Sequence, residues 1–351
     1  MAERFPIRVL LAEDSPTIRH YLTQVINEIP GLKVVGVARD GAEAVEMAEA
    51  LKPDVISMDI RMPGVDGLEA TRRIMSQNPV PIVMVSGLLD EEMDLSFQAL
   101  EAGALAVVPK PPSRDKPTFR HRQRQLAMTL VAMAGVRVVR RWDRAPGLNS
   151  AGGTGRLSDP QMAKPEILAI GASAGGPGAL ISFLGGLPDD LSIPVVIVQH
   201  MPDEFMTGLS RWLGESTSLP VRVAAHHTIL KPGIVYLSPG NAHLTVVRER
   251  ERLIACLEHE RGDHRYQPSV DVLLNSVAAV CGQKGIGMIL TGMGDDGAAG
   301  LLAMRGAGAR TFAQDRASCT VYGMPAAAVE RGGVEQVLPL EKLPAAVVKL
   351  L

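Results

Sequence analysis

Short apolar runs alternate with amphipathic segments between residues 7 and 110 of the chain. The apolar runs are typical of buried strands and lie at 7–12, 34–38, 54–58, 81–85 and 105–108. The segments between them have apolar residues at three- and four-residue spacing, as amphipathic helices do, and lie at 17–28, 41–51, 67–77 and 91–101. Alternating strands and helices build a parallel sheet with helices on both faces. We therefore expect an α/β fold whose first domain is doubly wound, with a flavodoxin-like strand order.

A second alternating series begins near residue 166. Its strand candidates include 167–170, 194–198 and 286–290, so we expect a second doubly wound parallel-sheet domain, of Rossmann-like type. Three further apolar runs interrupt this series, at 233–237, 243–247 and 253–256. We interpret them as antiparallel strands of a hairpin region.

The length of 351 residues exceeds the usual range of a single domain and favours two. A helical pattern at 117–133 precedes a stretch rich in glycine and proline at 146–160, which is typical of a flexible connector. We expect the first domain at 1–123, its last helix and a basic, glycine-rich linker at 124–163, and the second domain at 164–351.

Positive charge gathers between residues 113 and 144, where nine Lys or Arg and two Asp give a net charge of +7. The whole chain has a formal net charge of -2 and carries no overall nucleic-acid signature. The basic stretch lacks interleaved aromatic residues and any recognisable nucleic-acid-binding motif. A solvated helix face and linker is therefore favoured, and we expect no nucleic-acid partner.

No part of the sequence predicts insertion into a membrane. No apolar stretch approaches the ~20 residues of a membrane-spanning helix, and the first six residues lack the apolar core of a signal peptide. The cysteines Cys256, Cys281 and Cys319 lack metal or redox spacing, which favours a reducing compartment. We expect a cytoplasmic protein.

Acidic residues follow two strands that should be neighbours in the first domain. Glu13 and Asp14 come after the first strand and Asp59 after the third, and a flavodoxin-like order places these ends in one crevice. Converging carboxylates favour a divalent cation with oxygen ligands, most plausibly Mg²⁺, with Asp59 as phosphoryl acceptor. Ser86 and Lys110 point to the same edge and are predicted to hold phosphoryl oxygens. Any one of these acids alone could equally be a helix cap.

A glycine-rich turn in the second domain, 171–176, leaves the hydroxyl of Ser173 uncovered after a strand. His200 ends the run at 194–198 and should lie at the same carboxyl edge of the sheet. The pattern predicts Ser173 as a nucleophile and His200 as its base. A dinucleotide-binding turn is the alternative, but its middle glycine is replaced by Ser173, and the end of the next strand carries Gln199 and His200 where the ribose-binding acid is expected.

A third component of this site is expected after the run at 286–290, where Asp295 and Asp296 are equal candidates for the acid that orients the histidine. An oxyanion could be bound by backbone N–H groups after the serine, as at Ala174, or around Met293. The sequence pattern does not choose between these donors.

The first third of the chain resembles a two-component receiver domain. The resemblance rests on Glu13-Asp14, Met58 to Gly67, Ser86 and Pro109-Lys110-Pro111. It implies phosphorylation of Asp59 by a chemotaxis-type histidine kinase, with Mg²⁺ held by the acidic cluster. One departure is visible: Ala106-Val107-Val108 stand where many receivers have an aromatic residue before the lysine.

The second domain resembles the catalytic domain of the chemotaxis protein-glutamate methylesterases. The matching segments are 171–176, 199–201, 268–271, 291–297, 313–319 and 323–325. The resemblance implies Ser173, His200 and Asp296 as the catalytic residues, with Ala174 where threonine is frequent. It also implies ester hydrolysis on methyl-accepting chemotaxis receptors, a second activity as glutaminase, and no cofactor for the esterase.

Receiver and esterase together cover nearly the whole chain, and they predict an enzyme switched on by phosphorylation. Unphosphorylated, the receiver is expected to lie across the Ser173 cleft. Two alternatives of other classes are a non-catalytic, phospho-dependent binding module and a dinucleotide-binding enzyme.

Overall fold

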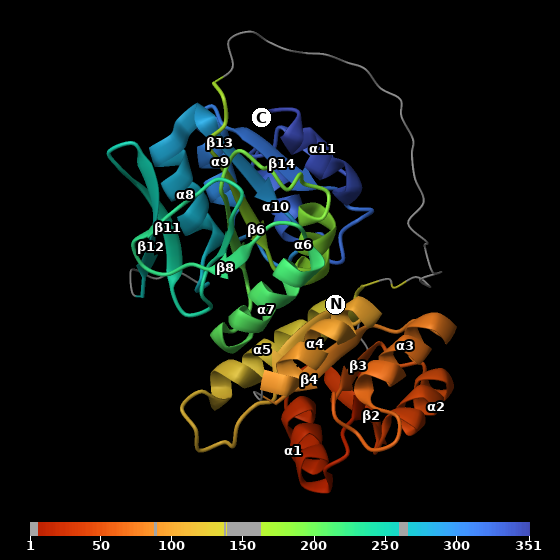
Figure 1. Ribbon diagram of the computed structural model, residues 1–351. Coiled ribbons are helices and arrows are strands. Elements are labelled where there is room, and N and C mark those ends of the chain that lie inside the picture. The colour runs from red at the N-terminus through yellow and green to blue at the C-terminus, as the bar shows by residue number, and fades with distance from the viewer. Residues whose placement is uncertain (1–5, 88–89, 137, 139–162, 260–265) are drawn as a thin grey trace.

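The computed structural model describes residues 6–87, 90–136, 138, 163–259 and 266–351. Two parallel sheets, each covered by helices, lie in the N- and C-terminal parts of the chain, and a small antiparallel sheet accompanies the second (Figure 1). The expected connector at 146–160 lies outside the described residues. The α/β fold with two doubly wound domains is confirmed.

The first sheet has the expected order β2-β1-β3-β4-β5, and all its pairings are parallel. Its strands are β1 (Ile7–Ala12), β2 (Leu32–Ala38), β3 (Val55–Met58), β4 (Ile82–Ser86) and β5 (Ala106–Pro109). Its helices are α1 (Pro16–Asn27), α2 (Gly41–Leu51), α3 (Gly67–Gln77), α4 (Asp90–Ala102) and α5 (Phe119–Ala134). Local chemistry fixes three helix starts, because the side chains of Ser15, Asp40 and Asp66 each accept a hydrogen bond from a first-turn amide.

Helix α5 belongs with the first sheet by its packing. Its buried residues, Phe119, Leu126, Leu130 and Met133, join the cluster formed by strand residues such as Val9. The expected boundary between residues 123 and 124 therefore falls inside this helix. The domain limits themselves stay a prediction.

The second sheet has the order β15-β14-β13-β6-β7-β10-β8, with every pairing parallel. Its strands are β6 (Ile167–Ala172), β7 (Val195–Gln199), β8 (Val221–Val223), β10 (Val235–Leu237), β13 (Gly285–Ile289), β14 (Arg310–Gln314) and β15 (Gln336–Leu338). Its helices are α6 (Gly176–Leu184), α7 (Asp203–Ser216), α8 (Val270–Cys281), α9 (Ala298–Gly306), α10 (Met324–Glu330) and α11 (Leu343–Val348), with 3-10 turns at Gly282–Lys284 and Leu340–Lys342. Because β13, β6 and β7 are consecutive in the sheet, their carboxyl ends lie together.

The antiparallel sheet contains β11 (His243–Glu249), β12 (Arg252–Glu258) and β9 (Thr228–Ile229). The expected hairpin at 243–247 and 253–256 is confirmed. The antiparallel interpretation of 233–237 is wrong, because β10 pairs in parallel with β7 and β8. All three β10 residues are buried, so this strand has the continuous apolar pattern of a parallel-sheet interior.

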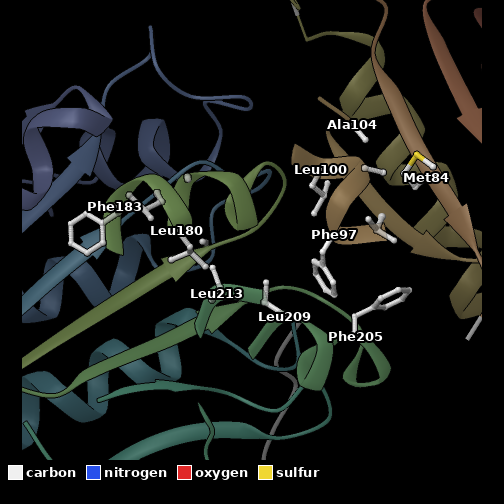
Figure 2. Close-up of a cluster of buried hydrophobic side chains, with 14 of the residues drawn as sticks. Met84, Phe97, Leu100, Ala104, Leu180, Phe183, Phe205, Leu209 and Leu213 are labelled. Carbon is white, nitrogen blue, oxygen red and sulfur yellow. The ribbon is translucent and has the colours of Figure 1, made fainter. Parts of the chain in front are cut away.

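The two domains share one buried hydrophobic cluster. It contains Phe97 and Leu100 from α4 and Phe205 and Leu209 from α7, with Phe97 only 1% exposed (Figure 2). The ring of Phe97 stacks on Trp212 of α7 at a centroid distance of 5.3 Å. Helices α4 and α7 therefore pack against each other across the domain boundary, as Figure 1 shows.

Candidate active site

The turn after β6 holds Ser173 between fixed backbone neighbours. Gly175 has φ +75, and a Cβ there would lie 2.4 Å from Thr320 side-chain atoms, so both the conformation and the space require glycine. The amide of Ser173 donates to Thr291 O at 3.0 Å. The Gln199 side chain, from the end of β7, donates through Nε2 to Ser173 O at 2.8 Å. Hydrogen bonds from residues beside both neighbouring strands thus fix the serine backbone.

His200 and Asp296 form a direct pair at the carboxyl edge. His200 Nε2 lies 2.8 Å from Asp296 Oδ2, and the two side chains are 14% and 2% exposed. The amide of His200 donates to Ala172 O at 2.9 Å, which anchors the histidine beside the Ser173 turn. Since Nε2 faces the carboxylate, Nδ1 is the ring nitrogen left to receive a proton from the serine. No hydrogen bond of 3.5 Å or less joins the Ser173 hydroxyl to the imidazole among the described residues.

Further donors hold the Asp296 carboxylate. The Ser269 hydroxyl donates to Oδ1 at 2.8 Å, the Val270 amide to Oδ2 at 2.7 Å and the Asp271 amide to Oδ1 at 3.0 Å. Burial of Asp296 acts to raise its pKa, but the hydrogen bond and charge of His200, with these backbone amides, outweigh burial and lower that pKa. Asp296 is therefore an anion at neutral pH.

The competing acid lies elsewhere. Asp295 is half exposed and its Oδ2 lies 3.4 Å from Arg331 Nη2 at the surface. Of the two acids that the sequence left equal, Asp296 alone contacts His200 among the described residues.

The backbone groups proposed to bind an oxyanion lie in the same cleft. Ala174 and Met293 both line the cavity beside Ser173 and His200. The Thr291 hydroxyl donates to Ala174 O at 2.9 Å and accepts from the Val321 amide at 2.9 Å, which ties the loop after β13 to the serine turn. Ala174 and Met293 therefore lie at the same cleft.

The first domain covers this cleft. The cavity at Ser173 measures about 100 Å³ and is lined on its other side by residues of β5 and α5, including Val108, Gln125 and Met133. Ala174 also packs against the core cluster of the first domain. Residues of the first domain therefore restrict access to Ser173 in this arrangement.

The acidic cluster of the first domain converges as expected. Ala12 and Met58 are paired residues of β1 and β3, so Glu13 and Asp59 follow adjacent strand ends. Carboxylate oxygens of Glu13, Asp14 and Asp59 lie within 4.8 Å of one another. Burial raises the pKa of Glu13, and the charge of Asp59 adds to this effect; burial likewise raises the pKa of Asp59. Oxygen donors at this spacing, two of them buried and one exposed, repel one another and fit a divalent cation.

Lys110 and Ser86 lie beside this cluster. Lys110 forms ion pairs with both acids, with Nζ 2.8 Å from Asp59 Oδ2 and 2.9 Å from Glu13 Oε2. Burial acts to lower the pKa of Lys110, but its contacts with Asp59 and Glu13 outweigh burial and raise that pKa. Ser86 is fully buried at the end of β4 and donates to Gly87 O at 3.0 Å.

Family models match both halves of the chain. The CheB methylesterase model matches residues 168–347, and the response regulator receiver domain model matches residues 9–118. The chain belongs to the CheB methylesterase family. Receiver domains generally bind Mg²⁺ through an acidic cluster of this kind.

Curated relatives align with nearly the whole chain. The chain is 43% identical to protein-glutamate methylesterase/protein-glutamine glutaminase 4 of Myxococcus xanthus, over 96% of this chain and 95% of that protein. It is 41% identical to a protein of the same name from Nitrosospira multiformis, over 98% and 97% of the two chains. The crystal structure of the Thermotoga maritima CheB methylesterase catalytic domain aligns with a TM-score of 0.52 and 34% identity, covering 54% of this chain and all of that one.

Sequence patterns alone missed several groups at this CheB-type site. Gln199 stood beside His200, yet only the folded structure brings its buried amide to Ser173 O. Ser269 precedes a helix and accepts from the Val272 amide as an N-cap should, but its hydroxyl also donates to Asp296. The Asp271 carboxylate accepts from the Gly300 amide at the start of α9. No local sequence pattern indicates the hydrogen bonds at Ser173, Asp296 and Gly300, because each joins residues that are distant in the chain.

No helix among the described residues of this CheB-family chain has both the length and the apolarity to cross a membrane.

Proposed function

We propose that the chain is a phosphorylation-activated serine hydrolase that removes methyl groups from glutamate γ-methyl esters on methyl-accepting chemotaxis receptors. The single observation that carries this proposal is the buried His200–Asp296 pair at the strand edge that also bears Ser173. Family membership supports the substrate class, because the matched relatives are named protein-glutamate methylesterases.

The reaction proceeds through a covalent acyl-enzyme. Ser173 Oγ attacks the ester carbonyl while His200 Nδ1 takes the hydroxyl proton, and Asp296 stabilises the resulting imidazolium. Backbone N–H groups at Ala174 or Met293 bind the oxyanion. Collapse of the tetrahedral intermediate breaks the bond to the methoxy oxygen, which leaves as methanol with the proton from His200. Water then hydrolyses the acyl-enzyme by the same proton transfers, giving the glutamate carboxylate.

Receptor glutamines are a second substrate in this proposal. An amide must leave as ammonia, so the leaving nitrogen has to be protonated, and His200 can supply that proton. The names of the matched relatives, which include protein-glutamine glutaminase, support this second activity.

Regulation is assigned to the receiver. A chemotaxis histidine kinase in the cytoplasm transfers a phosphoryl group to Asp59, and Glu13, Asp14 and Asp59 would hold Mg²⁺. Mg²⁺ would shield the charge of the incoming phosphoryl group. Lys110 and Ser86 hold the phosphoryl oxygens, and the receiver then leaves the Ser173 cleft. The cavity of about 100 Å³ shared by receiver and esterase residues supports this coupling.

A methanol-release assay on methylated receptor membranes tests the proposal, with and without a small phosphodonor. Ser173→Ala should abolish methanol release, and Asp59→Asn should keep basal release but lose the response to phosphodonor. Near-normal turnover by Ser173→Ala would exclude the nucleophile, whereas a stimulated Asp59→Asn variant would point to another acceptor. Saturable dinucleotide binding by calorimetry would instead favour the nucleotide-dependent alternative.

A further inference from the structure

An aromatic ring lies flat against the histidine of the catalytic pair. The rings of Tyr266 and His200 are stacked with centroids 5.1 Å apart and an interplanar angle of 6°. None of the steps assigned above to Ser173, His200 and Asp296 uses this tyrosine. The tyrosine nevertheless contacts His200, and the orientation of the His200 ring decides whether it can accept a proton from the serine.

The stacked tyrosine belongs to the segment that also binds the acid. Ser269, Val270 and Asp271, which begin α8 shortly after Tyr266, supply the donors to the Asp296 carboxylate. One short stretch of chain thus contacts both partners of the pair, with a ring on the imidazole and N–H and O–H groups on the carboxylate.

This segment is tied to the catalytic domain at several points. Gln267 Nε2 donates to Asn241 O at 3.0 Å and to His259 O at 2.8 Å. The Ser269 amide donates to the buried His243 Nδ1 at 3.1 Å, which joins the segment to β11. Tyr266 therefore lies next to residues that are held in place by hydrogen bonds.

The far end of the tyrosine meets the loop that carries Asp296. Gly294 has φ +91, and a Cβ there would lie 2.5 Å from the Tyr266 hydroxyl oxygen. The phenol thus occupies the space beside a glycine between Met293 and Asp295. Its ring is confined by the imidazole on one side and its hydroxyl by this loop.

A single hydrogen bond cannot fix an imidazole ring. The bond from His200 Nε2 to Asp296 Oδ2 sets the position of one nitrogen but leaves rotation of the ring about that axis. Such rotation would change the direction in which Nδ1 points within the cleft that Ser173 also lines. A parallel ring against the imidazole face restricts this rotation, and its π face also attracts the imidazolium that forms during turnover.

We propose that Tyr266 is a positioning residue of the hydrolase, whose ring holds the His200 imidazole in the plane that presents Nδ1 to Ser173. This inference rests on the proposed role of His200 as the base. The aromatic ring carries the effect, so phenylalanine can replace tyrosine here and an aliphatic residue cannot.

The test compares Tyr266→Leu with Tyr266→Phe in the full-length, phosphodonor-activated enzyme. Steady-state methanol release should show kcat reduced about tenfold in Tyr266→Leu, the size expected of a lost cation–π contact, with KM changed less than twofold. Tyr266→Phe should stay within twofold of the wild type in both constants. Circular dichroism and thermal unfolding establish that each variant is folded.

A spectroscopic measurement addresses the stack without relying on activity. With ¹³C-labelled histidine, the ring C–H resonances of His200, assigned by their loss in His200→Gln, should show an upfield ring-current shift in the wild type and in Tyr266→Phe. The shift should disappear in Tyr266→Leu. Because the wild-type signal alone reports the stack, an unfolded leucine variant would leave the test intact.

The outcomes separate this inference from the function on which it rests. An active His200→Ala variant would overturn the assignment of the base itself. If His200→Ala is inactive while Tyr266→Leu retains wild-type kcat, or if phenylalanine impairs kcat as much as leucine, only the inference about Tyr266 fails. A rise in KM with unchanged kcat would likewise overturn it, because it would mean substrate contact and not positioning of the base.

Discussion

The indole N–H of Trp212 in the catalytic domain donates to the Glu101 carboxylate of the receiver, with a distance of 2.9 Å from Nε1 to Oε1. The same indole stacks on Phe97, and nearby Arg122 of α5 pairs with Glu204 of α7. Trp212 lies in α7, and among the described residues no hydrogen bond or ring contact joins it to Ser173, His200 or Asp296. It therefore connects the two domains that together line the Ser173 cleft.

We expect Trp212→Ala to raise methanol release in the absence of phosphodonor. Loss of a central interface tryptophan weakens such contacts by about 2 kcal/mol or more, which shifts the closed-to-open equilibrium by ~30-fold. Basal turnover should therefore rise by up to ~30-fold, and the stimulation by phosphodonor should shrink in proportion. Trp212→Phe keeps an aromatic partner for Phe97 and should lie in between. Unchanged basal turnover in the alanine variant would mean that this contact does not restrain the receiver.

We predict very different effects for two neighbouring acids. Asp296→Asn removes the charge that orients His200 and stabilises its cation, and should lower turnover by about 10⁴. Asp295→Asn is the matched control, because Asp295 is half exposed and pairs only weakly with Arg331 at the surface. Its turnover should stay within about twofold of the wild type. Methanol-release kinetics measured on phosphodonor-activated protein distinguish the pair, and similar losses in both variants would contradict the assignment.

Mg²⁺ affinity should depend on pH. Burial is the main reason that the pKa values of Glu13 and Asp59 are raised above their ordinary 4.5 and 3.8. Protons therefore compete with the metal as the pH falls toward those raised values. Calorimetric titration should give weaker Mg²⁺ binding at acidic than at neutral pH. Asp14→Asn should weaken binding at neutral pH, whereas Glu49→Gln, an exposed acid outside the cluster, should not. Affinity independent of pH would contradict a site built from these carboxylates.

Two cysteines should resist thiol reagents in the native protein. Burial, followed by the charge of Glu166 for Cys281 and of Asp315 for Cys319, raises both pKa values to about 12. At pH 8 only ~10⁻⁴ of such a thiol is the reactive thiolate. A disulfide reagent that releases a coloured thiolate should therefore react slowly at both positions. All three cysteines should react quickly in guanidinium, and rapid labelling of Cys281 in the native state would show that burial does not protect it.

The sequence by itself determined the elements that depend on local pattern. Ser173, His200, Asp59 and Lys110 could be recognised because each follows a buried parallel strand. Such a strand appears in the sequence as a continuous apolar run, and a turn marks its end. The order of the first sheet then followed from general rules for doubly wound folds. That order alone predicts that Glu13 lies beside Asp59.

The tertiary structure decided the rest, because the remaining contacts join residues that are distant in the chain. Asp295 and Asp296 are equal in sequence, and only the packing of α8 against their loop gives Asp296 its buried donors. The apolar pattern of the strand at Val235–Leu237 is compatible with both parallel and antiparallel pairing. Its parallel pairing is therefore decided by the neighbouring strands. Gln199, Ser269 and Tyr266 act through partners that no spacing encodes, since side-chain hydrogen bonds and ring stacking depend on three-dimensional approach.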